Sequence, residues 1–89
     1  MPVVWIPFGM QRLTDGRERV QVAGATIRQV LNNLEEEFPG IKDELCDRDD
    51  INPGLAMIVD GETASLGLLE RVKEDSEIHF IPAIAGGAA

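Results

Sequence analysis

Cysteine is scarce in this chain: its 89 residues include only Cys46. A single thiol excludes an internal disulfide, a zinc ribbon and a cysteine-ligated iron–sulfur cluster. We expect Cys46 to be a small buried or half-buried side chain rather than a reactive thiol. The acidic residues that follow it (Asp47, Asp49 and Asp50) lack the central glycine and the closing glutamate of an EF-hand loop. The sequence therefore predicts no metal site.

Long apolar runs and positive charge are also scarce. No run approaches the ~20 residues that a membrane-spanning helix needs, and the N-terminal MPVVWIPFG lacks the basic region and long apolar core of a signal peptide. We therefore expect a cytoplasmic protein. Eight basic residues against 16 acidic ones give a net charge of −8. Because such a surface repels phosphates and anionic lipids, we expect no binding to nucleic acid or membranes, and partners with basic surfaces instead.

The composition is otherwise that of a small globular domain, with 44% hydrophobic and 27% charged residues. A chain of this length forms one domain and needs most of its large side chains to fill the core. Little room is left for a deep cofactor pocket, and no Ser-His-Asp set, phosphate-binding glycine loop or pair of catalytic carboxylates stands out. We therefore expect no bound cofactor and no enzymatic activity. Such a protein acts through its surface or its end.

Two strands and a turn are predicted near the N-terminus. Residues 3–8 are rich in β-branched and aromatic side chains, and Val20 and Val22 alternate with polar neighbours, as residues of strands do. The intervening Asp15-Gly16 pair is typical of a tight turn because glycine accepts a positive φ. The sequence therefore predicts an N-terminal β-hairpin.

Residues 26–38 have the pattern of an amphipathic helix. Thr26 can accept hydrogen bonds from the free N–H groups of the first turn, and Gln29 completes a capping box. Pro39-Gly40 ends the helix. Apolar residues recur at helical spacing on one face: Ile27, Val30, Leu31, Leu34 and Phe38. The cluster Glu35–Glu37 allows two interpretations, a solvated polar face or a contact surface for basic residues.

The remaining chain predicts two more strands. A short helical turn is expected over 41–45, a polar loop over 46–54, a strand in LAMIVDGE, a second short turn after it, and a last strand in EIHFIPA. Alternation places Ile58 opposite in face to Met57, and His79 and Ile81 opposite to Phe80. With a right-handed crossover through the helix, this order predicts an α+β, β-grasp (ubiquitin-like) fold. Its mixed sheet has four to five strands, and one main helix packs on one face.

At two places the sequence allows more than one interpretation of which side chains form the outer surface and what they do there. Trp5 is opposite in parity to Val4, Ile6 and Phe8, so either Trp5 or Phe8 contributes to an outer surface. His79 is either an ordinary surface histidine or part of a partly apolar docking patch with Ile58 and Ile81. A lone histidine without a cysteine, a second histidine or a nucleophile nearby suits neither a metal site nor catalysis.

This strand order, ending in IPAIAGG, resembles the ubiquitin-like sulfur-carrier proteins of the MoaD/ThiS family over essentially the whole chain. The segments VVWIPFGMQRLTDGRERVQV, LEEEFPGIKDEL and PAIAGG are most similar to one subgroup. Its members donate sulfur to a cysteine synthase or to specialised thiocarboxylate-dependent pathways. We accordingly expect a β-grasp domain over residues 1–83 and a flexible C-terminal tail over residues 84–89.

The resemblance implies how the tail reacts. In the family, a ubiquitin-activating-type enzyme uses ATP to adenylate the carboxylate of the final glycine, and sulfide or a persulfide converts the adenylate to a thiocarboxylate. Carried onto this chain, the reacting residue is Gly87. The residues expected to contact partners are Gly86, Ile84, Ile81, His79 and Ile58. The implied sulfur acceptor is a cysteine-synthase-type enzyme. The alternatives are the molybdopterin synthase large subunit, or conjugation through Gly87 as a ubiquitin-like modifier.

The Gly86-Gly87 pair also has a physical rationale. A tail without Cβ atoms can enter a narrow channel and bring its backbone close to the α-phosphate of ATP. Ala88 and Ala89 follow Gly87, so the Gly87 carbonyl belongs to an amide that cannot be adenylated. Some relatives carry such extensions, which a JAMM-type metalloprotease removes, and we therefore expect cleavage after Gly87. With an inert tail, the chain would instead be a plain interaction module.

Overall fold

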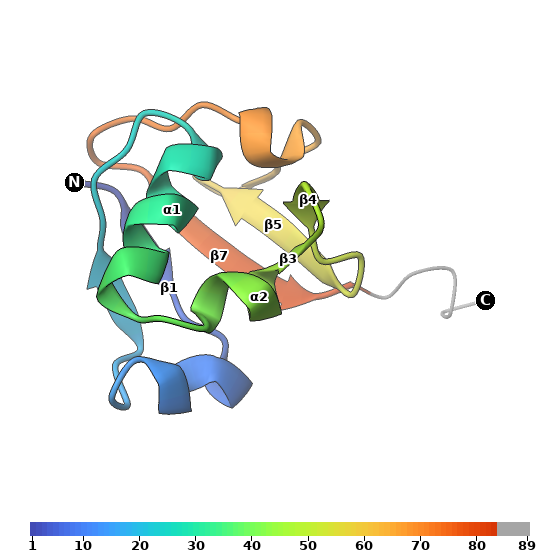
Figure 1. Ribbon diagram of the computed structural model, residues 1–89. Helices are drawn as coiled ribbons and strands as arrows, with labels where there is room; N and C mark the ends of the chain where they lie inside the picture. Colours follow the sequence, from blue (N-terminus) through green and yellow to red (C-terminus); the bar gives the residue numbers. More distant parts are fainter. Residues whose placement is uncertain (84–89) are drawn as a thin grey trace.

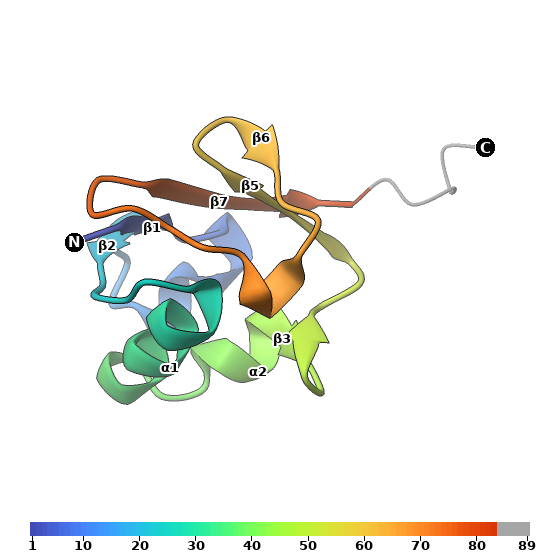
Figure 2. The same cartoon turned by 90° about the horizontal axis from the view of Figure 1, so that it is seen from above.

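A sheet of five strands, in the order β2-β1-β7-β5-β6, forms one layer of the molecule. The structure is a computed structural model that describes residues 1–83. β1 (Val3–Trp5) and β7 (Glu77–Pro82) pair in parallel at the centre, and β2 (Arg19–Gln21) pairs antiparallel with β1. β5 (Leu55–Val59) pairs antiparallel with β7, and β6 (Glu62–Thr63) forms the far edge. The helices cover one face of the sheet (Figure 1, Figure 2). The predicted α+β, β-grasp architecture is therefore confirmed.

The main helix, α1 (Ile27–Glu37), begins at the predicted residue. The Thr26 hydroxyl oxygen accepts a hydrogen bond from the backbone N–H of Gln29, at 3.3 Å. The Gln29 side chain in turn accepts a hydrogen bond from the Ala25 N–H, one residue earlier than in an ordinary capping box. α2 (Ile41–Leu45) follows the predicted stop at Gly40, whose φ of 100° favours glycine. No helix within residues 1–83 is long and apolar enough to span a bilayer.

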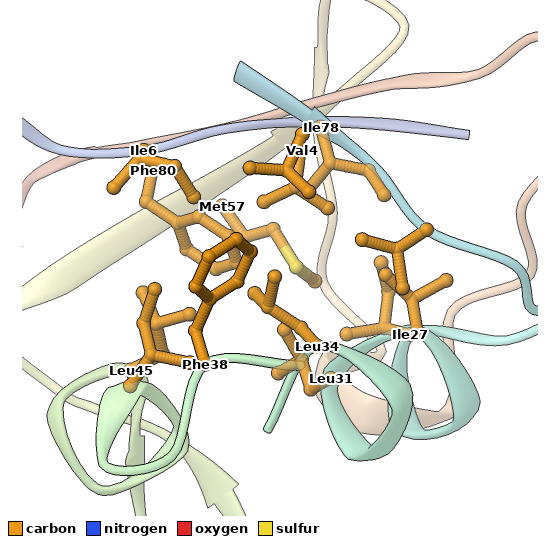
Figure 3. Close-up of a cluster of buried hydrophobic side chains, with 14 of the residues drawn as sticks. Val4, Ile6, Ile27, Leu31, Leu34, Phe38, Leu45, Met57, Ile78 and Phe80 are labelled. Atoms are coloured by element: carbon orange, nitrogen blue, oxygen red, sulfur yellow. The ribbon is translucent and has the colours of Figure 1, made fainter. Parts of the chain in front are cut away.

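One hydrophobic core joins the two layers (Figure 3). The sheet side contributes inward-facing side chains from β1, β2, β5 and β7 and from Ile6 just after β1, and α1 and α2 contribute one apolar face each. The buried sheet residues are Val4, Ile6, Val20, Met57, Ile78 and Phe80, and the buried helix residues are Ile27, Val30, Leu31, Leu34, Ile41 and Leu45. The predicted faces of α1, β5 and β7 are therefore confirmed.

The prediction of a strand over residues 3–8 is wrong for the second half of that segment. β1 ends at Trp5, and a 3-10 helix, η1 (Phe8–Leu13), follows. Pro7 explains the break, because proline has no N–H to donate to a sheet ladder. The parity argument consequently fails at Phe8, which is 90% exposed rather than core-facing. The turn is confirmed: Asp15 and Gly16 both have positive φ, and β1 and β2 are antiparallel.

The predicted polar loop over 46–54 and the segment after β5 contain short strands that the sequence did not indicate. β3 (Cys46–Asp47) and β4 (Asp50–Ile51) form a separate two-stranded antiparallel sheet, whose turn has Arg48 at a φ of 61°. The predicted turn at Asp60-Gly61 leads directly into β6. The second short helical turn is confirmed as η2 (Gly67–Leu69). Strands of two residues show no periodicity, so local sequence could not reveal them.

Candidate functional site

The sheet face opposite the helices carries the candidate site. Within residues 1–83 no helix covers this face (Figure 2). Its central feature is a row of side chains, one from each strand, which we call the outer row. The strand register aligns them in the order Arg19, Trp5, His79, Ile58 and Thr63. Directly paired residues on one face of a sheet have Cβ atoms close enough for their side chains to interact.

Trp5 is held in place by three neighbours in and beside this row. Its ring stacks on the His79 imidazole, with centroids 5.1 Å apart and planes 12° from parallel. The Arg19 guanidinium carbon lies 5.5 Å from the Trp5 ring centroid, a cation–π distance. The Trp5 indole N–H donates a hydrogen bond to the Glu77 carboxylate at 3.1 Å. These contacts present a fixed aromatic surface on the outer face.

The structure brings together three of the residues predicted to contact partners. Ile58 pairs directly with His79 in the row, and Ile81 is the next outward residue of β7 and pairs with Ala56. Ile58 and His79 are half-buried, whereas Ile81 is 47% exposed. These residues form the partly apolar patch that the sequence predicted. Gly86, Gly87 and Ile84 lie outside the described residues.

The sequence left open whether Trp5 or Phe8 contributes to an outer surface, and the structure places Trp5 on the outer face of the sheet. Trp5 points to the outer face, whereas Phe8 is exposed on η1 and does not belong to the outer row. Alternation alone could have placed Trp5 and Arg19 on one face. Their alignment with His79 could not be predicted, because it depends on the pairing of β1 with β7, which lie more than 70 residues apart.

A hollow opens beside the outer row between β2, β1 and β7. Its volume is about 350 Å³, and its lining residues are Val3, Trp5, Arg19, Val20, Gln21 and Glu77. It contains one cationic and one anionic side chain. The Glu77 carboxylate already accepts the Trp5 N–H, whereas Arg19 lies on the exposed edge strand. The hollow can therefore accept a side chain from another molecule.

Comparison with known proteins identifies the family. The model of the ThiS family matches residues 8–87. The chain belongs to the ThiS family. The resemblance to MoaD/ThiS proteins is thereby confirmed, and this is a family of small ubiquitin-like carrier proteins. The match extends through Gly86 and Gly87.

Several solved structures are similar to this ThiS-family chain. A chain of the Amycolatopsis orientalis BexX/CysO complex matches with a TM-score of 0.88 and 28% identity, covering 98% of this chain and 100% of that one. Mycobacterium tuberculosis CysO matches with a TM-score of 0.86 and 25% identity, covering 93% and 99%. SAMP1, a small archaeal modifier protein of Methanosarcina acetivorans, has a TM-score of 0.77 but 19% identity, which shows the fold alone; it covers 97% and 95%. No curated protein matches the sequence. The CysO structures agree with the predicted subgroup.

The structure also shows the surroundings of Glu35 and Cys46 in this ThiS-family chain, and these surroundings shift the pKa of each side chain. Glu35 is not simply part of a solvated face, because its carboxylate accepts hydrogen bonds from the Gly40 and Lys42 N–H groups at 2.9 Å each. These bonds lower the pKa of Glu35. Cys46 is half-buried, as predicted, and burial raises the pKa of its thiol, which disfavours the reactive thiolate.

The exposed side chains in the described part of the chain are suited to binding a partner. Residues 1–83 contain no cluster of three side chains able to hold a metal ion. The outer row offers a flat aromatic surface, aliphatic side chains and one accessible guanidinium. β7 carries His79 and Ile81 and continues toward Gly86 and Gly87 in the sequence. A partner that takes up the tail would therefore be near this face.

Proposed function

We propose that this ThiS-family chain is a sulfur carrier that reacts through the carboxylate of Gly87. The observation that carries the proposal is the extent of the family match, which includes both glycines and stops before Ala88. Hydrolysis of the Gly87–Ala88 peptide bond by a JAMM-type metalloprotease frees the carboxylate. The chain itself binds no cofactor and has no enzymatic activity. It acts in the cytoplasm as a substrate of its partners.

The carboxylate then requires activation, because a carboxylate is a poor electrophile. Its oxygen attacks the α-phosphorus of ATP on a ubiquitin-activating-type enzyme, and pyrophosphate leaves. Sulfide attacks the acyl carbon of the adenylate, AMP leaves, and Gly87 carries a thiocarboxylate. Residues without Cβ at positions 86 and 87 allow the backbone to reach the nucleotide. Ile84 and the outer-face residues Ile58, His79 and Ile81 contact the enzyme.

The sulfur acceptor that we propose is an enzyme of the cysteine-synthase type. The support is the similarity to CysO, at 28% identity in the structure that contains BexX and 25% in the second structure. The large subunit of molybdopterin synthase is the alternative acceptor. Incubating the thiocarboxylated chain with each enzyme type separates them, because only the true acceptor returns Gly87 to a carboxylate in a substrate-dependent reaction.

The first experiment is the intact mass of the chain purified from its native host. We expect loss of Ala88 and Ala89, followed by a gain equal to the mass difference between sulfur and oxygen. A mass that includes both alanines under every growth condition would contradict the proposal, because Gly87 would remain an amide. Adducts on lysines of other proteins, abolished by deleting Gly86 and Gly87, would instead indicate a ubiquitin-like modifier. The likeness to SAMP1 does not favour that role, since at 19% identity it concerns the fold alone.

A further inference from the structure

Charge is distributed unevenly along the chain. Residues 1–25 carry three arginines against two acidic side chains, a net charge of +1, whereas residues 26–89 carry five basic and 14 acidic side chains, a net charge of −9. The first of these segments forms β1, η1 and β2, which include one edge of the sheet. A negatively charged partner surface is therefore repelled by most of the molecule but not by this edge.

Arg19 is the cation of this segment that belongs to the outer face. It pairs with Trp5 across β1 and β2, and its guanidinium lies over the Trp5 ring. It also lines the hollow of about 350 Å³ beside the row. The other charged side chain of the hollow is Glu77, which accepts the Trp5 N–H. The contact with the ring favours this position of the Arg19 guanidinium, and the planar N–H groups of a guanidinium can receive a carboxylate.

We propose that Arg19 binds a carboxylate of the adenylating enzyme that activates Gly87, while Trp5, His79, Ile58 and Ile81 contact an adjoining apolar surface of that enzyme. This inference rests on the proposed function and names the partner that recognises the outer row. The acidic remainder of the chain contacts basic surfaces or solvent. Arg19 therefore determines the orientation in which the carrier docks.

The adenylating enzyme is the partner for which such a contact matters most. The chain carries a net charge of −8, and this enzyme is the one proposed partner that brings a polyanionic nucleotide to the tail. Repulsion between carrier and nucleotide opposes docking, and an ion pair at the cationic edge offsets it. The reaction also requires alignment of the Gly87 carboxylate with the α-phosphorus, which a fixed docking orientation supplies.

The test compares charge variants in the native host by intact mass, which reports two steps separately. The variants are Arg19→Glu, Arg19→Gln and, as a control with the same charge change on the exposed side of α1, Arg28→Glu. We expect Arg19→Glu to lose Ala88 and Ala89 normally but to form thiocarboxylate about tenfold less than wild type or lower, because like charges would face each other. Arg19→Gln should show a smaller loss, and Arg28→Glu should match wild type. Circular dichroism of each purified variant verifies that it is folded.

Each alternative result overturns the inference in a recognisable way. Thiocarboxylate at the wild-type level in Arg19→Glu would exclude a docking role for Arg19. Retention of Ala88 and Ala89 in that variant would assign the surface to the protease. Thiocarboxylate above the wild-type level would assign it to the sulfur acceptor, because product would accumulate. Wild-type protein that never carries thiocarboxylate would reject the proposed function itself, and this inference with it.

Discussion

At the scale of single residues, Glu35 connects the end of α1 to the start of α2. Its carboxylate accepts two backbone hydrogen bonds, from Gly40 and Lys42. We expect Glu35→Gln to lower the free energy of unfolding at neutral pH by about 1 kcal/mol, because a charged acceptor is replaced by a neutral one at a half-buried site. Glu36→Gln is the matched control, since Glu36 is exposed and should change stability little. Chemical denaturation of both variants measures the difference.

The same two hydrogen bonds make Glu35 a source of acid sensitivity. They hold its pKa in the folded protein below the ordinary value of 4.5. The stabilisation is therefore complete above that ordinary value and is lost as the pH falls through the lower folded-state pKa. The difference in unfolding free energy between wild type and Glu35→Gln should therefore shrink as the pH falls from about 5 to about 3. A difference that stays constant over this range would contradict the assignment.

At the scale of elements, Gly24 determines how closely α1 approaches the end of β2. Its φ is 152°, and a Cβ there would lie 2.7 Å from the backbone nitrogen and from Cγ2 of Val30. Gly24→Ala must displace the first turns of α1, and we expect a loss of about 1–3 kcal/mol in the free energy of unfolding. Gly9→Ala is the control, because its Cβ would meet nothing within 4 Å. Similar losses for the two variants would mean that close packing at Gly24 is not the cause.

The 3-10 helix η1 separates Phe8 from the core. We expect Phe8→Ala to change the free energy of unfolding by less than about 0.5 kcal/mol, because the side chain is 90% exposed. Ile6→Ala should cost about 2–5 kcal/mol, since Ile6 has the same parity in the sequence but is 5% exposed. Equilibrium denaturation of both variants tests this contrast. A comparable loss at both positions would indicate that Phe8 is buried like Ile6, as the prediction of one continuous strand over residues 3–8 requires.

The elements that could be predicted are those whose apolar residues repeat. α1 shows a helical period over three turns, and β5 and β7 alternate over five and six residues. Their buried faces follow from the same pattern. η1 could not be predicted by extending the alternation of β1, because Pro7 ends the ladder irrespective of hydrophobicity. β3, β4 and β6 have two residues each and therefore no period to detect.

The sequence could predict which residues lie on the outer face of the sheet, but not which residues of different strands lie next to one another there. Parity within β7 and β5 placed His79, Ile81 and Ile58 together, and the register confirms that placement. The stack of Trp5 on His79 and the position of Arg19 depend on the parallel pairing of β1 with β7. Such pairing is selected by the global packing of the sheet rather than by neighbours in the sequence.

At the scale of the whole molecule, one chain presents two different surfaces. The segment over residues 26–51, which includes both α-helices, covers the apolar side of the sheet and carries eight of the 16 acidic residues. The opposite face presents the outer row, in which Arg19 and His79 flank Trp5. A single layer of helices on a sheet leaves one sheet face available. The fold thereby separates the surface that stabilises the domain from the surface that meets its partners.

Because one core joins both layers, we expect the molecule to unfold in a single step. Leu31 of α1 is fully buried, and Leu31→Ala should lower the free energy of unfolding by about 2–5 kcal/mol. Trp5 is the only tryptophan and lies on the sheet, so its fluorescence reports the sheet, while far-ultraviolet circular dichroism reports α1. Both signals should shift to the same lower denaturant midpoint in Leu31→Ala, and neither should shift in the exposed control Arg28→Ala. A Trp5 transition that stays at the wild-type midpoint while helicity is lost would show that the two layers unfold independently.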